Sequence, residues 1–201
     1  MRKLASILAA LMLFPLAMQA GEPHFSYGLE WGYTATFFKH ATHNFICSEG
    51  YRINDDINTW RFFSNGAVMA NVGVDLTPRL NVSAYTGLLG VYSRRWVIPA
   101  ELRFRYCPSG LASNGPIFHA GAAAVYPTTT LTDTGARGLV GGGYRLAIYK
   151  TLSVDFLISF NLTVDHDLIT DPDTREYVLR KDITSNVSEY CGVNMSVALN
   201  F

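Results

Sequence analysis

Residues 190–201 of this 201-residue chain read YCGVNMSVALNF, and two chemistries alternate along this segment. In an extended strand, successive side chains point to opposite faces. One face is apolar and carries Cys191, Val193, Met195, Val197, Leu199 and Phe201. The other face is small and polar and carries Gly192, Asn194, Ser196, Ala198 and Asn200. Because a tilted strand of about 11 residues can cross a bilayer, the segment predicts a membrane-crossing β-strand.

Seven other segments alternate with the same period. They are residues 25–37, 68–76, 80–92, 96–106, 117–126, 140–148 and 152–162. The two longest connections, residues 38–65 and 164–186, follow the first and the seventh segments, whereas the connections after the second, fourth and sixth are short. Short connections at one rim and long ones at the other are typical of outer-membrane barrels. We therefore predict an all-β, eight-stranded antiparallel up-and-down transmembrane β-barrel.

The amino terminus predicts export. Arg2 and Lys3 precede an apolar run that ends near Met18, and small residues follow it. This is the pattern of a secretory signal peptide, so we expect residues 1–20 to be cleaved and residues 21–201 to form one barrel domain. The formal net charge of zero gives no electrostatic case for nucleic acid as a partner.

The polar faces distinguish a membrane barrel from a soluble lipocalin-type carrier. These faces are mainly Gly, Ser, Asn and Ala, and the lysines after residue 20 are Lys39, Lys150 and Lys181, all in predicted connections. A water-exposed wall needs bulky charged residues, whereas the crowded lumen of eight strands needs small ones. The apolar faces are therefore predicted to meet lipid.

The same alternation points seven charged side chains into the lumen. They are Glu30, Asp75, Glu101, Arg103, Arg105, Arg145 and Asp155. An unpaired buried charge is very costly, and eight strands leave no room for an aqueous channel. We expect an ion-paired, plugged lumen, with a narrow pore as an alternative.

The alternation, the apolar strand that ends in Phe201 and the start Leu29-Glu30-Trp31-Gly32 resemble the small outer-membrane barrels of OmpA/OmpX type, including uncharacterised barrels of Bacteroidetes type. The resemblance implies a monomer in the bacterial outer membrane, with a structural or loop-mediated binding or adhesion role and no cofactor. Its expected partners are outer-membrane lipid, lipopolysaccharide and an extracellular ligand bound by residues 38–65 and 164–186.

A catalytic alternative follows from two small-barrel enzyme classes, the lipid A palmitoyltransferases and deacylases, which use a histidine with a serine and an acidic residue at the outer rim. The candidates in this chain are His40, His43, Ser48 and His166. A general base needs an activatable hydroxyl within hydrogen-bond reach. The His-x-Ser-Asn pattern of the deacylases is absent, so lipid A modification stands second to a binding role.

Three cysteines, Cys47, Cys107 and Cys191, allow at most one intramolecular disulfide. Cys191 lies about ten residues before the end of the last strand, and Cys47 follows the first strand by a similar count. A bridge between them is therefore one prediction, and a free, lipid-facing Cys191 is the other. The acidic run over residues 165–173 lacks the glycine of a calcium loop, so we expect no metal.

Overall fold

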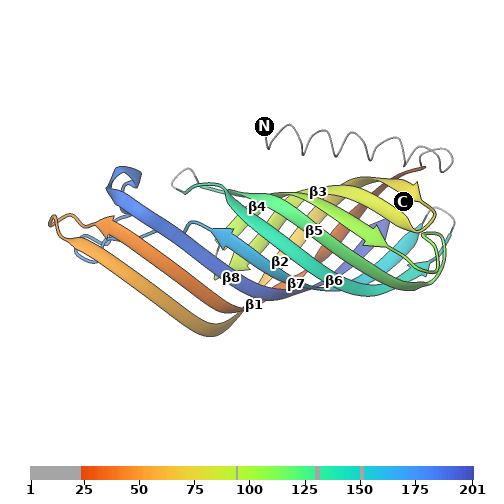
Figure 1. Cartoon of the computed structure of the whole chain (residues 1–201), viewed down its shortest axis with the longest axis horizontal. Helices are drawn as coiled ribbons and strands as arrows, with labels where there is room; N and C mark the ends of the chain where they lie inside the picture. The colour runs from red at the N-terminus through yellow and green to blue at the C-terminus, as the bar shows by residue number, and fades with distance from the viewer. Residues whose placement is uncertain (1–23, 94, 130–131, 150–151) are drawn as a thin grey trace, which may run out of the picture.

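The computed structural model describes residues 24–93, 95–129, 132–149 and 152–201, and the predicted signal peptide lies outside them. The described residues form eight antiparallel strands that close a barrel in chain order (Figure 1). The strands are β1 (His24–Ile46), β2 (Arg52–Thr77), β3 (Leu80–Tyr92), β4 (Arg95–Tyr106), β5 (Gly115–Pro127), β6 (Gly135–Ala147), β7 (Ser153–Asp165) and β8 (Ile183–Asn200). The all-β, eight-stranded up-and-down barrel is therefore confirmed.

The alternation in sequence becomes an alternation in burial. Along β4, every second residue is buried and each residue between is exposed. In β8, Asn194, Ser196 and Asn200 are buried, whereas Met195 is 60% exposed. Small polar residues thus line the lumen, and apolar residues cover the outside of the wall.

The seam between β1 and β8 closes the barrel. Glu30 pairs with Ala198 in the register of this seam, and backbone bonds between Tyr27 and Phe201 run in both directions at 3.1 and 2.7 Å. The rings of Tyr27 and Phe201 also stack, with centroids 5.4 Å apart. This seam joins the two strands that are furthest apart in the chain.

Glycines let β6 approach β7 closely. A Cβ atom on Gly141 would lie 2.2 Å from the carbonyl oxygen of Ile158, and one on Gly143 would lie 1.9 Å from that of Phe156. Both distances are far inside van der Waals contact, so these two positions require glycine.

Residues 38–65 were predicted to be a loop, and the structure corrects this. β1 continues to Ile46 and β2 begins at Arg52, with paired residues from Phe38↔Trp60 to Ile46↔Arg52. A bulge between Thr36 and Phe38 shifts the register and moves the inward positions from even to odd numbers, which hides the alternation. We call residues 38–46, 52–63 and 183–190 the arm; it projects beyond one end of the barrel (Figure 1).

The connection between β7 and β8, residues 166–182, lies along one face of the arm, and we call it the strap. Ile169 and Val178 of the strap pack with Phe45 and Cys47 of the arm. The strap ends in a single 3-10 turn, η1 (Arg180–Asp182). The strap thus covers an apolar face that the arm would otherwise expose.

Candidate functional site

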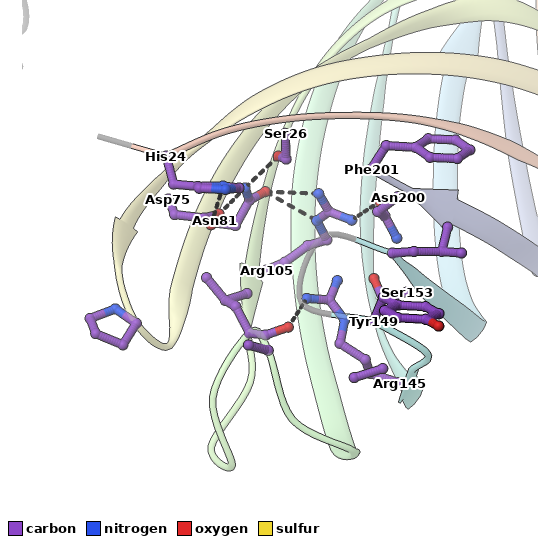
Figure 2. A pocket seen from close by; sticks show the side chains of 15 residues that line it. His24, Ser26, Asp75, Asn81, Arg105, Arg145, Tyr149, Ser153, Asn200 and Phe201 are labelled. Atoms are coloured by element: carbon purple, nitrogen blue, oxygen red, sulfur yellow. Dashed lines mark hydrogen bonds and ion pairs between the residues drawn. The ribbon is translucent and has the colours of Figure 1, made fainter. Parts of the chain in front are cut away.

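A lower layer of charge spans the lumen near the chain termini. Arg145 binds Asp155 through two hydrogen bonds of 2.7 and 2.6 Å, and Arg105 lies 3.5 Å from the same carboxylate. Arg105 also donates to Asn81 and Asn200, at 2.9 and 2.6 Å (Figure 2). These buried bonds satisfy both guanidinium groups with acceptors from facing strands.

An upper layer lies next toward the arm. Arg103 binds Glu30 and Glu101, each at 2.7 Å, and its guanidinium carbon lies 4.0 Å from the centre of the Tyr85 ring. Arg137 lies 3.2 Å from the second oxygen of Glu101. One carboxylate from β1 is thereby linked to charged groups on β4 and β6.

The sequence prediction missed Arg137, and this residue balances the charge of the lumen. The predicted strand started at residue 140, whereas β6 starts at Gly135. Arg137 has the same parity as Arg145 and so points inward, which an earlier strand start would have revealed. With Arg137, four arginines face four carboxylates in the two layers and the adjoining mouth: Arg103, Arg105, Arg137 and Arg145 against Glu30, Asp75, Glu101 and Asp155.

Asp75 differs from the other six predicted lumen charges. Its carboxylate accepts a hydrogen bond of 2.7 Å from Asn81 and lies 3.5 Å from the imidazole of His24, and no guanidinium among the described residues pairs with it. Asp75 lines a hollow of about 240 Å³ at the barrel mouth, which ends at Arg105 and Arg145 (Figure 2). The mouth therefore opens onto the lower layer.

The connection over residues 107–114 crosses this mouth. The backbone amide of Leu111 donates to the carbonyl of Pro78 at 2.8 Å, and the carbonyl of Leu111 accepts from Arg145 at 2.9 Å. The Leu111 side chain packs against a buried cluster in the lumen that includes Ile117 and Leu157. The connection narrows the mouth and braces the lower layer.

A buried apolar cluster fills the lumen between the upper layer and the arm, and we call it the apolar plug. It comprises Ala67, Leu89, Val91, Val97, Val125 and Tyr190, with Tyr92 packed against it. On β4, Val97 lies four residues nearer the arm than Glu101, so the plug covers the upper layer. Along the described lumen, the two charged layers are thus followed toward the arm by this apolar cluster.

At the base of the arm, the carboxylate of Asp167 holds the strap. It accepts hydrogen bonds from Lys39 at 2.5 Å, from Ser188 at 2.9 Å and from the hydroxyl of Tyr190. Burial by itself raises the pKa of Asp167, but the Lys39 ammonium and these hydrogen bonds outweigh it and hold the pKa below its usual value. We call this cluster the latch.

His43 lies beside the latch without joining it. Its Nε2 atom is 3.9 Å from the carboxylate of Asp167. Burial is the main influence on its imidazole and lowers the pKa, against the opposing charge of Asp167. His43 is therefore neutral at pH 7.

The structure does not bring the catalytic candidates together. His40 contacts the side chain of Asn58 at 2.9 Å, and the backbone amide of Ser48 donates to Asp171 at 2.7 Å. In the part of the chain that the structure describes, no hydrogen bond joins His40, His43 or His166 to a serine hydroxyl. The arrangement lacks the base and nucleophile pair that acyl transfer requires.

The predicted Cys47–Cys191 bridge is wrong, because Cys47, Cys107 and Cys191 are all free thiols. Cys191 pairs with Phe38 across the seam, and Cys47 lies nine residues (47 − 38) further along the chain, past the end of β1. Nine residues of strand span about 30 Å, whereas a disulfide needs Cα atoms within about 7 Å. The extension of β1 into the arm separates the two cysteines.

Across the described ranges, no three His, Cys, Asp or Glu side chains are grouped so that they could hold a metal ion. A helix long and apolar enough to span a membrane is also absent from these ranges.

No family model and no curated protein match the chain. Solved structures similar to it include the outer membrane protein AlkL, determined by solid-state NMR in DMPC bilayers, with 11% identity, coverage of 90% of this chain and 92% of that chain, and a TM-score of 0.43. Another is the outer membrane protein OprG from Pseudomonas aeruginosa, with 9% identity, coverage of 90% and 98%, and a TM-score of 0.45. Evidence for function therefore comes from the chain's own residues.

Proposed function

We propose that this chain is an integral outer-membrane β-barrel with a plugged lumen, and that its arm binds an extracellular partner. The membrane location is supported by a belt of exposed apolar side chains around the wall. The belt includes Leu29, Trp31, Val72, Leu102, Phe118, Val140, Ile158, Phe160 and Met195. A contiguous apolar surface of this extent needs lipid or protein to cover it.

The height of the belt fits a bilayer. Ten residues of β1 separate Tyr27 from Phe37, which corresponds to about 33 Å of strand and about 25 Å of height at a tilt of about 40°. Exposed aromatic side chains border the belt at both ends, with Phe25, Tyr27, Tyr106 and Tyr149 at one end and Trp60, Phe62, Trp96 and Tyr126 at the other. Aromatic girdles of this kind mark the two membrane interfaces of outer-membrane barrels.

The plugged lumen is supported by the balance of its charges and by the apolar plug. In the two layers, four guanidiniums pair with three carboxylates at 2.6 to 3.5 Å, and Asp75 in the adjoining mouth is the fourth carboxylate. No net charge is left to attract an ion, and the apolar plug lies across the path to the arm. The lumen acts as the core of the protein, in place of the apolar core of a soluble barrel.

The binding role rests on one observation, an unpaired strand edge in the arm. Residues 52–60 of β2 pair with β1, whereas the pairing of β2 with β3 begins only at Ala67↔Leu89. At the opposite side of the arm, Asn186 of β8 exchanges hydrogen bonds of 3.2 and 2.7 Å with the backbone of Asp167 in the strap. A free edge accepts an added strand from a partner through backbone hydrogen bonds. The length of the arm, at the rim opposite the short turns, supports a location of the arm outside the cell.

The chemistry of the edge favours a basic partner strand. Asp55 and Asp56 lie side by side along the edge and point to opposite faces of the sheet, and both are exposed. An extended segment with lysine or arginine at two adjacent positions would meet both carboxylates. Partners of this kind include the basic segments of surface proteins.

A synthetic peptide with two adjacent lysines flanked by threonines tests the binding role. We expect it to bind the full chain in nanodiscs and to slow amide exchange at residues 54–59. The D55K/D56K double variant should lose this binding and gain binding of the matching threonine–glutamate peptide. The D173K variant, altered in the strap, is the control. Equal binding of the lysine peptide to all three proteins would overturn the proposal.

A further inference from the structure

Another hollow, of about 340 Å³, opens beside β8 at the base of the arm, and we call it the rim pocket. It exists because β7 ends at Asp165, whereas β8 continues along β1 as far as Ile183. Three segments line this gap: residues 132–133 after β5, the two ends of the strap at His166 and Arg180, and residues 183–187 of β8. The volume lies within the range of ligand-binding clefts.

Hydrogen bonds from the buried Arg95 hold the wall of the rim pocket in place. Arg95 donates to Asp165 at 2.9 Å, to the hydroxyl of Thr132 at 3.1 Å and to the carbonyl of His166 at 2.7 Å. One guanidinium therefore ties together the β5–β6 connection, the end of β7 and the start of the strap. A site held in this way loses little entropy when a ligand binds.

The groups that face the pocket are polar and available. Arg180 and Asp133 form an ion pair of 2.6 Å, but they are 78% and 46% exposed, so the pair is weak and a ligand can share both groups. The buried Nδ1 atom of His166 has no hydrogen-bond partner among the described residues. Leaving a buried nitrogen unpaired is costly, and a rotation of the His166 ring toward a ligand hydroxyl would remove this cost.

The combination of groups identifies the class of ligand. Arg180 and Asp133 cancel in charge, so the pocket offers a phosphate no net attraction. A carboxylate acceptor, a guanidinium donor, an imidazole and the hydroxyls of Thr184 and Ser185 instead match neighbouring sugar hydroxyls, which both donate and accept. We infer that the rim pocket binds a sugar residue, either in a glycolipid headgroup or in a free oligosaccharide.

The position of the rim pocket relative to the belt favours a glycolipid headgroup over a free oligosaccharide as the source of the sugar. Val187 lines the pocket, and four residues further along β8 lies Cys191, which pairs with the exposed, belt-forming Leu162. Four residues correspond to about 13 Å of tilted strand. The pocket therefore lies just above the belt, where glycolipid sugars meet the wall. This step rests on the proposed membrane location.

The test uses the full chain in nanodiscs that contain rough-type lipopolysaccharide, with phosphatidylglycerol nanodiscs as the comparison. We expect NMR shifts at the amides of residues 184–186 only with lipopolysaccharide. The D133N and H166F variants should each bind about tenfold more weakly, as expected for the loss of one polar contact to the ligand. The control is D182N, a carboxylate in η1 that does not line the pocket.

Each result of this binding experiment either supports or overturns the assignment of a sugar to the rim pocket. Equal binding by D133N, H166F and D182N would overturn the inference, as would displacement by inorganic phosphate, which would indicate an anion site. Binding of the free core oligosaccharide with the same affinity would support the sugar class and identify a soluble source. Failure of the chain to insert into nanodiscs would contradict the proposed function, whereas insertion without sugar binding would contradict only this inference.

Discussion

The barrel and the arm are built from the same strands, and they use charge in opposite ways. In the barrel, Arg103 and its carboxylate partners are at most 3% exposed and form the core itself. At the arm, Phe45 packs with Ile169 of the strap in a small apolar core, and most charged groups lie at the surface. A bulge in β1 lies between the barrel, which has a charged core, and the arm, which has an apolar one. The comparison shows that a polar interior goes with an apolar outer wall in the barrel, and that this inversion stops at the bulge.

The largest expected effect comes from breaking the upper layer. Arg103→Ala leaves Glu30 and Glu101 as buried carboxylates with reduced pairing, so we expect the free energy of unfolding to fall by about 3–5 kcal/mol. Urea unfolding in micelles, followed by tryptophan fluorescence, measures this change. The exposed Arg61→Ala is the matched control, with an expected change within about 0.5 kcal/mol. A change of ion selectivity in Arg103→Ala at unchanged stability would contradict the plugged lumen.

A smaller, local effect is expected at the latch. Asp167→Asn removes the charge that holds Lys39 and weakens the bonds to Ser188 and Tyr190, at a cost of about 1.5–3 kcal/mol to strap docking. Hydrogen exchange should accelerate at Ile169 and at neighbouring strap amides, while the barrel amides stay protected. Acceleration that extends into the barrel would show that the two regions unfold together.

The contribution of the latch to strap docking should also depend on pH. Because the pKa of Asp167 is lower in the folded protein, the latch contributes fully above the usual carboxyl pKa of about 4 and is lost as the pH falls through the lower folded value. Strap exchange in the wild type should therefore rise on acidification below pH 4, and exchange in Asp167→Asn should not respond to this titration. An equal response in both proteins would exclude Asp167 as the titrating group.

The smallest effect is expected at the surface of the strap. Arg180→Ala removes an exposed ion pair with Asp133 and should change stability by less than about 0.5 kcal/mol. Thermal unfolding of this variant beside Arg103→Ala sets the scale of the comparison. A loss of stability as large as that of Arg103→Ala would show that ion pairs at the rim stabilise the protein as much as ion pairs in the lumen do.

The barrel could be predicted from the sequence because the face of each strand residue depends only on its position within the strand. Each residue of β4 and β8 takes its face from parity alone, and the inward positions of Glu30 and Arg145 followed from it. The arm escaped prediction because one extra residue at Phe37 reverses that parity, so aromatic and polar residues no longer alternate in a fixed phase. Arg137 was missed for a related reason, since glycines blur the start of β6.

The contacts of the rim could not be predicted, because they depend on register between distant segments. The latch joins Lys39 to Asp167, 128 positions away in the chain. The rim pocket depends on the unequal ends of β7 and β8, and the separation of Cys47 from Cys191 depends on the length of β1. Parity gives the face of a residue but not its height relative to a neighbouring strand.

The β1–β8 seam has a consequence for how fast this protein folds. Seven of the eight strand pairings form between consecutive strands, whereas the seam brings together groups such as Glu30 and Ser196, which are 166 positions apart. Loop closure over such a separation is entropically costly and slows folding. The hairpins can form early, but each charge layer is complete only when the cylinder closes. We therefore expect closure of the β1–β8 seam to be the slowest step of assembly.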